Sequence, residues 1–182
     1  MEDSVTTSAG SPASGPEHEL DGRSTSELLA LYGSILTILR RRGITRSENP
    51  PTGDYAELLA ARAFTLRLTN NSKSALDGTD DSGLRYQVKG RRMTPWNKSR
   101  QLSAIRGLDA PAPPFDFLIG ILFNPDYTIL RAALVPYGQV LPRATFQSHV
   151  NGWRFMLNDI VWTLDGVRDV TKEIRAATTA DG

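Results

Sequence analysis

The sequence predicts an α/β domain in which helices flank a mixed central sheet, and three observations lead to this fold class. An amphipathic helical pattern occupies 25–42, short strand patterns follow up to 89, and the run at 115–123 is almost continuously apolar. Such a run is typical of a strand that is covered on both faces. Helices that alternate with strands around one buried strand form a layered sandwich. At 182 residues, one domain over 23–178 with tails is the simplest organisation.

Composition limits the classes of protein and of site. The chain has no cysteine and two histidines, which argues against a zinc site, so any metal would be a hard ion held by oxygens. Residues 1–22 are rich in Ser, Gly, Pro and acids and are predicted to be a disordered tail. They have neither the cationic start nor the apolar run of a signal peptide, and no segment is apolar over the length of a bilayer. We therefore expect a soluble, cytoplasmic protein with no membrane partner.

The first helix is predicted over 25–42. Ser24 and Glu27 have the spacing of a capping box. Apolar residues recur at helical spacing at Leu28, Leu31, Tyr32, Ile35 and Leu39. Three arginines at 40–42 precede Gly43 and suit the negative end of the helix dipole, so we interpret them as a solvated C-terminus.

A second helix is predicted over 52–64, with Thr52 as its N-cap, and it carries an acid on an apolar surface. The helical neighbours of Glu57 on its C-terminal side are all apolar. A buried carboxylate needs a partner or a metal, because an unpaired charge in low dielectric is costly. The alternative is a Glu57 that is exposed or paired with Arg62.

Three short strands are expected around Thr65–Leu68, Lys73–Leu76 and Leu84–Lys89. Successive side chains in a strand point to opposite faces, so Gln87 and Lys89 share a face. A hairpin between the last two strands would place Asp77 beside them.

The turn of that hairpin is predicted at 80–83, where Asp80 and Asp81 precede Ser82-Gly83. Aspartate is common in such turns for structural reasons. If the first arm of the hairpin is shorter, however, Asp80 rather than Asp77 would be the candidate ligand.

The remaining elements follow from turn and periodicity signals. We expect a short helix in 99–107 capped by Ser99, the buried strand in 115–123, its hairpin partner at 128–135, a strand at 152–157, a turn at 165–166 and a helix at 169–177. Trp153 and Trp162 are interpreted as core residues.

The stretch 85–106 is strongly basic inside a chain whose net charge is +1. Its cations are Arg85, Lys89, Arg91, Arg92, Lys98, Arg100 and Arg106, with no acid among them and with Tyr86 and Trp96 interleaved. This pattern suits a polyphosphate backbone and stacked bases. A solvated charged face, or a surface that docks an acidic protein, explains the same residues.

These residues resemble the motif of the PD-(D/E)xK nuclease superfamily, which has the restriction-endonuclease-like fold. The resemblance covers about 50–135 and rests on Glu57 in a helix, Asp77 at a strand end and Gln87-Val88-Lys89 on the next strand. The wording "GDYAE…YQVKGRR…SRQLSAIR" also looks like uncharacterised bacterial proteins related to that fold. The order implied by the superfamily is helix, three strands, helix, strand.

The resemblance implies a catalytic set and a function. Glu57, Asp77 and Gln87 would bind Mg²⁺, or Mn²⁺ in its place, and Lys89 would position the attacking water and stabilise developing charge. Nucleic acid, most plausibly DNA, would lie on Arg91, Arg92, Lys98, Arg100 and Arg106. The implied protein is a metal-dependent DNA endonuclease of restriction or defence type, acting as a homodimer because so small a core needs a second copy to cut both strands.

Two residues depart from the motif. No proline precedes Asp77, and Gln87 stands where the superfamily has an acid. An amide is a neutral and weaker ligand for a hard cation than a carboxylate. Glutamine at this position occurs in active relatives and also in folds that have lost catalysis, so an inactive nucleic-acid-binding module remains the alternative function.

Overall fold

The computed structural model describes residues 17–46, 50–69 and 76–181. Most of the tail expected over 1–22 therefore lies outside the described residues. Residues 17–22 are described and form turns.

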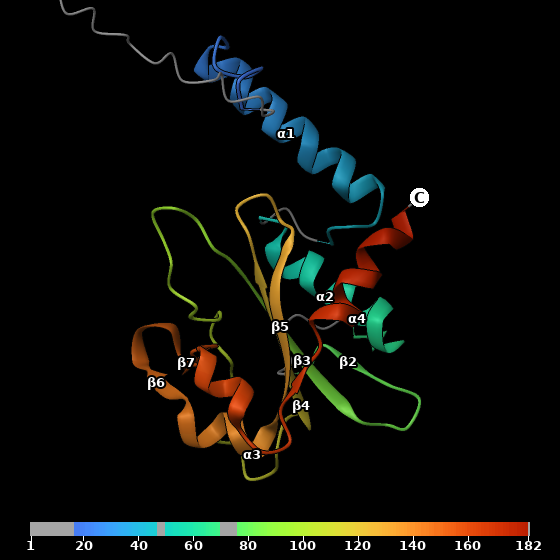
Figure 1. Cartoon of the computed structure of the whole chain (residues 1–182), viewed down its shortest axis with the longest axis vertical. Helices are drawn as coiled ribbons and strands as arrows, with labels where there is room; N and C mark the ends of the chain where they lie inside the picture. Colours follow the sequence, from blue (N-terminus) through green and yellow to red (C-terminus); the bar gives the residue numbers. More distant parts are fainter. Residues whose placement is uncertain (1–16, 47–49, 70–75, 182) are drawn as a thin grey trace, which may run out of the picture.

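The described residues form a mixed six-stranded sheet and four α-helices, which confirms the predicted α/β class (Figure 1). The helices are α1 (Thr25–Arg41), α2 (Thr52–Phe64), α3 (Tyr137–Val140) and α4 (Thr171–Ala176). The sheet strands are β1 (Arg67–Leu68), β2 (Gly78–Thr79), β3 (Arg85–Arg92), β4 (Phe117–Phe123), β5 (Ile129–Pro136) and β8 (Arg168–Asp169). A separate hairpin contains β6 (Thr145–Gln147) and β7 (Gly152–Arg154), and short 3₁₀ turns lie at Leu141–Arg143, Ser148–Val150, Asp159–Thr163 and Ala177–Asp181.

The strands lie in the order β1-β2-β3-β4-β5-β8, and β3 and β4 form the one parallel pair between neighbours in this sheet. β4 is the buried central strand that the apolar run at 115–123 predicted, and six of its seven residues are buried. β5 returns beside it as the expected hairpin partner. The turn predicted at 165–166 is also present.

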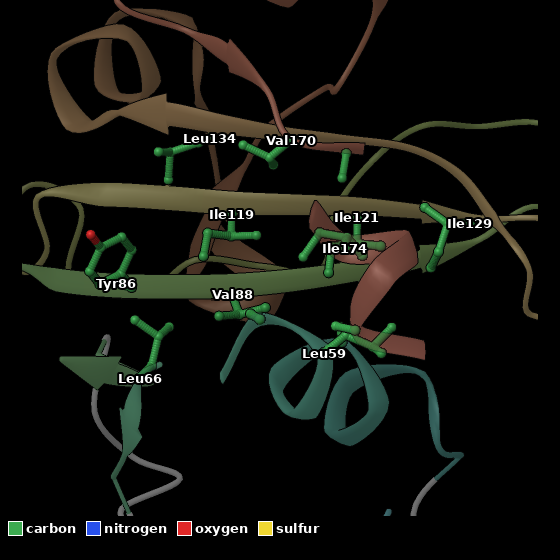
Figure 2. Close-up of a cluster of buried hydrophobic side chains, with 14 of the residues drawn as sticks. Leu59, Leu66, Tyr86, Val88, Ile119, Ile121, Ile129, Leu134, Val170 and Ile174 are labelled. Atoms are coloured by element: carbon green, nitrogen blue, oxygen red, sulfur yellow. The ribbon is translucent and has the colours of Figure 1, made fainter. Parts of the chain in front are cut away.

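Two apolar cores lie on opposite faces of the sheet. One contains Val88, Ile119 and Ile121 from the strands and is covered by α2 and α4 through Leu59 and Ile174 (Figure 2). The other core is formed by residues of β4 and β5 together with Leu102, Ile105, Phe115, Phe155 and Leu157. Trp153 and Trp162 pack against this second core, as predicted.

The close approach of α2 to the sheet depends on Gly90. A Cβ at this position would lie 2.8 Å from the carbonyl oxygen of Thr52 and 2.9 Å from the Cβ of Ala56. Glycine in β3 therefore lets the helix rest directly on the strand, which fixes α2 over the centre of the sheet.

The prediction of a helix in 99–107 is wrong. Leu102 and Ile105 are fully buried in the second core, and the backbone of this segment bonds to 153–157 instead of to itself. Gln101 bridges Met156 and Ile105 bridges Trp153. The hydroxyl of Ser99 does accept the Gln101 N–H at 3.3 Å, but no helix follows it.

Several predicted boundaries also differ. The strand placed at 73–76 is instead β2, two residues beyond Leu76, while 73–75 lie outside the described residues. Pro51 rather than Thr52 is the N-cap of α2, and the Thr52 hydroxyl lies 3.2 Å from that of Tyr127.

The first helix begins and ends close to its predicted bounds, and the capping box of Ser24 and Glu27 is present. The arginines at 40–42 are exposed, as predicted. None of the helices in the described part of the chain combines the length and the apolar character needed to cross a bilayer.

Candidate functional site

The register of β2 and β3 brings three polar side chains of the motif to one place. Gly78 pairs with Tyr86 in the antiparallel ladder, so the preceding Asp77 lies opposite Gln87. Gln87 and Lys89 alternate with Tyr86 and Val88, whose side chains pack in the core under α2. The polar pair therefore lies on the opposite face of the sheet from α2.

One carboxylate oxygen of Asp77 is the centre of the site. Its Oδ2 accepts a hydrogen bond from the Nε2 of Gln87 and another, at 2.7 Å, from the backbone N–H of Val88. The Nζ of Lys89 lies 3.7 Å from the same oxygen. Acid, amide and amine thus form a compact cluster, which we call the Asp77 site.

The Asp77 site is largely withdrawn from water. Gln87 is 2% exposed, and the side chains of Asp77 and Lys89 are 15% and 18% exposed. Burial lowers the pKa of the Lys89 ammonium, and the neighbouring Asp77 carboxylate opposes that shift only in part. A lysine in this condition is more easily deprotonated than one in solvent and has a cationic head that is poorly hydrated.

The amide of Gln87 presents its nitrogen to Asp77, whereas the sequence led us to expect its oxygen on a metal. A carboxylate accepts hydrogen bonds and does not donate them, so the amide must offer its donor here. Rotation of the terminal amide would exchange the two atoms and turn Oε1 to the same point.

Glu57 does not contact Asp77 in the described structure; it forms an ion pair with Arg46. Arg46 also donates to the backbone carbonyl of Thr69, at 3.2 Å, and its N–H donates to Asp54. The buried acid therefore has a cationic partner in place of a metal. Sequence reasoning missed Arg46, because it lies in a loop before α2 with no pattern that pairs it with Glu57.

A chain of contacts links Glu57 with the backbone of Asp77. The N–H of Thr69 donates to the carbonyl oxygen of Asp77 at 2.9 Å. Arg46 thus connects the helix acid with the strand end that carries Asp77.

The predicted nucleic-acid residues do not form one surface. Arg91 is on the same side of β3 as Lys89, and its Nε donates to the carbonyl of Ser99 at 3.1 Å. Arg92 points to the other side, where it donates to Pro125 and its guanidinium lies 4.9 Å from the Tyr127 ring centre. Strand alternation separates the two arginines, which the expectation of one basic patch had ignored.

The other cations of the basic stretch differ in their availability. Arg100 forms an ion pair with Asp159 at 2.7 Å, so part of its charge is already matched. Lys98 and Arg106 are exposed, and Trp96 is 93% exposed in the same segment. Tyr86 is buried and cannot serve as a stacking platform, which corrects that part of the expectation.

Asp80 is a turn residue, as predicted. Its Oδ1 accepts hydrogen bonds from the N–H groups of Ser82 and Leu84 and from the Ser82 hydroxyl. These bonds, chiefly that of the Ser82 side chain, lower the pKa of Asp80. Asp77 rather than Asp80 therefore contacts Gln87.

The Asp77 site has few of the oxygen ligands that a metal centre usually gathers from the protein. No group of three or more histidine or acidic side chains gathers as a metal centre among the residues that the structure describes. The Asp77 site offers one carboxylate and one amide oxygen, whereas Glu57 lies on α2, over the other face of the sheet, and pairs with Arg46.

Comparison of the sequence with models of known protein families and with curated protein sequences finds no match.

Proposed function

We propose that the chain is a metal-dependent phosphodiesterase with a restriction-endonuclease-like fold that cleaves nucleic acid, in the first instance DNA. The single observation that carries this proposal is the meeting of Asp77, Gln87 and a buried Lys89 from two adjacent strands. A carboxylate and a lysine held together out of water are the groups that phosphodiester cleavage requires.

The order of elements supports the same proposal. Helix α2 is followed by β1, β2 and β3, and then by β4 parallel to β3. This is the order expected of the superfamily, except that the segment 93–116 between β3 and β4 contains no helix.

The donor set suits Mg²⁺ held by few protein oxygens. Mg²⁺ binds through one or two carboxylates and keeps several waters, and substrate phosphate fills further positions. Asp77 would hold the ion through its carboxylate and Gln87 through Oε1 after rotation of the amide. Bound there, such an ion supplies charge neutralisation at the phosphoryl group and a lowered pKa of a coordinated water.

The residues of the chain itself then have distinct tasks. Lys89 donates to a phosphoryl oxygen or to the attacking water, and its poor hydration strengthens that contact. Arg91, two residues further on the same face, contacts the phosphate backbone and fixes the position of the nucleic acid on the protein. Val88 holds the Asp77 carboxylate in place through its backbone N–H.

Titration calorimetry with Mg²⁺ and Mn²⁺, combined with plasmid nicking on the same samples, tests this function. We expect binding and nicking by the wild type and loss of both in Asp77→Ala. Asp81→Ala is the matched control, because Asp81 is a nearby carboxylate whose side chain is 83% exposed. Wild-type protein that neither binds these ions nor nicks plasmid, even with DNA present, would exclude the catalytic proposal.

A second candidate is a nucleic-acid-binding module that has lost catalysis. The observation that favours it is the Gln87 amide, whose donor satisfies Asp77 without any ion. Gln87→Glu distinguishes the two: an enzyme keeps or gains metal affinity when the carboxylate is restored, whereas a binding module binds DNA with no metal response in either form.

A further inference from the structure

Helix α1 has a wide apolar surface that the described part of the chain leaves uncovered. None of its residues is buried, and the exposed fractions of Leu29, Tyr32 and Ile35 are 66%, 48% and 45%. Figure 1 shows α1 projecting away from the sheet. Its large apolar side chains all lie on one half of the helix, at Leu28, Leu29, Leu31, Tyr32, Ile35, Leu36, Ile38 and Leu39.

A helix of this kind needs a partner. Most helical stability in proteins comes from packing an apolar face and not from intrinsic helix propensity. The capping box of Ser24 and Glu27 supports only the first turn of α1, which has 17 residues. Packing against another surface must supply the rest.

A groove beneath α1 indicates the size of that partner. Tyr32, Ile35 and Leu39 form one wall, and Tyr55 and Tyr127 belong to the other. Its volume is about 1750 Å³, which exceeds the roughly 300–1,000 Å³ of ordinary small-molecule pockets. The space therefore suits a helix better than a small ligand.

We propose that the occupant is α1 of a second copy of this chain, packed antiparallel against the first. Leu28, Leu31, Ile35 and Ile38 alternate at spacings of three and four, the pattern of a coiled-coil seam. In an antiparallel pair, Leu28 of one copy faces Ile38 of the other, and Leu31 faces Ile35. Ile35 also lines the groove, so the seam runs along its rim.

The charges at the two ends of α1 favour this orientation and this partner. The N-terminal end carries Glu17, Glu19, Asp21 and Glu27 against one cation, Arg23, whereas the C-terminal end carries the arginines at 40–42. Antiparallel packing places the acidic end of each copy beside the basic end of the other, which makes the surface self-complementary about a two-fold axis. A helix lying on a membrane would instead have cations along its polar face, where α1 has Ser26, Gly33, Ser34 and Thr37.

Sedimentation equilibrium of the full chain tests the proposal, with concentrations from about 1 to about 100 μM. The protomer is 20.0 kDa, and we expect a particle of twice that mass. Ile35→Asp should weaken dimerisation by more than about tenfold, because it places a charge in the seam. Thr37→Asp adds the same charge two residues away, at an exposed position on the polar face, and should leave the dimer intact.

Two outcomes overturn the proposal. One is a wild type that remains monomeric over the whole range, in which case binding of α1 to anionic lipid vesicles would reassign it to a membrane surface. The other is an equal effect of Ile35→Asp and Thr37→Asp. Neither outcome bears on metal binding or nicking, so this test is separate from that of the proposed function.

Orientation is tested by cross-linking, because the chain has no cysteine of its own. Leu28→Cys and Ile38→Cys are prepared as separate proteins and oxidised alone and as a mixture. Disulfides form only between Cα atoms within about 7 Å, so the antiparallel pair should cross-link in the mixture and much less in either protein alone. Cross-linking of each protein with itself would show a parallel pair and contradict the proposed arrangement.

Discussion

Strand β3 carries two carboxylate–cation pairs that differ in kind. Near its start, Arg85 contacts Asp116 through Nε at 3.1 Å and Nη2 at 2.9 Å, with both side chains about one-third exposed. Four residues later, Lys89 lies 3.7 Å from Asp77 and both side chains are more than four-fifths buried. The two pairs use the same strand and similar chemistry in different surroundings.

The pKa shifts show that the surroundings favour the charged forms in one pair and disfavour the charged lysine in the other. The hydrogen bonds between Arg85 and Asp116 raise the pKa of the arginine and lower the pKa of the carboxyl, so the pair stabilises both charges. Burial lowers the pKa of Lys89 although an acid is its neighbour, so the Asp77 site holds a charge at a cost. A costly buried charge that is not needed for the fold is characteristic of a functional site.

The largest expected effect is that of Lys89→Met on cleavage. Methionine fills a similar volume without a charge, so we expect nicking to fall by at least about 100-fold, as for the loss of one donor to a transition-state oxyanion. The melting temperature should change little, because removal of a charge that burial disfavours offsets the loss of a cation beside Asp77, whose Oδ2 keeps its hydrogen bonds from Gln87 and Val88. Plasmid nicking and thermal unfolding of the same preparation provide the measurement.

The alternative function, a nucleic-acid-binding module without catalysis, predicts a different result. In that case the wild type would not nick DNA, and Lys89→Met would only reduce DNA affinity. A Lys89→Met protein that melts well below the wild type and still nicks DNA would show that Lys89 is a structural partner of Asp77.

Arg85→Met should have the opposite pattern: a small loss of stability and no loss of nicking. Arg85 holds Asp116 and also donates to the carbonyl of Pro113 at 2.7 Å. Because the pair is partly exposed and screened by solvent, we expect a loss of about 1 kcal/mol in unfolding free energy. That corresponds to a fall of about 2–4 °C in melting temperature for a chain of this size, with nicking retained. A loss of cleavage without a loss of stability would remove the distinction between the two pairs.

Local patterns in the sequence predicted those parts of the fold that local forces determine. The apolar run at 115–123 predicted β4 because burial on both faces leaves few alternatives to a central strand. The segment 99–107 was predicted wrongly because Leu102 and Ile105 have helical spacing, yet their backbone bonds lie with 153–157, about fifty residues away. Periodicity carries no information about such a distant partner.

The candidate site was likewise predictable where it depends on local strand geometry and not where it depends on distant partners. Alternation along β3 correctly placed Gln87 and Lys89 on one face, and the hairpin brought Asp77 to them. The same rule, applied further, would have separated Arg91 from Arg92. The ion pair of Glu57 with Arg46 was not predictable, because it depends on the path of a loop and not on any spacing.

The smallest effect, and the finest test of the comparison, is the pH dependence of stability. The pKa of Lys89 in the folded chain is lower than its ordinary value of 10.5, so between those two values the unfolded chain binds the extra proton. Stability therefore rises with pH in that window, by at most about 1.4 kcal/mol per pH unit for one proton.

Lys89→Met lacks this gain, so its stability relative to the wild type should fall as pH increases from about 7 to about 10. Burial, helped by the hydrogen bond to Asp80, raises the pKa of Tyr86 to about 12, so above about pH 10 ionisation of the unfolded tyrosine reduces the stability of both proteins alike. That contribution cancels in the difference between them, which isolates Lys89. Denaturant unfolding of both proteins at several pH values measures the difference, and a constant gap across the range would mean that the Lys89 ammonium is as well accommodated as the guanidinium of Arg85.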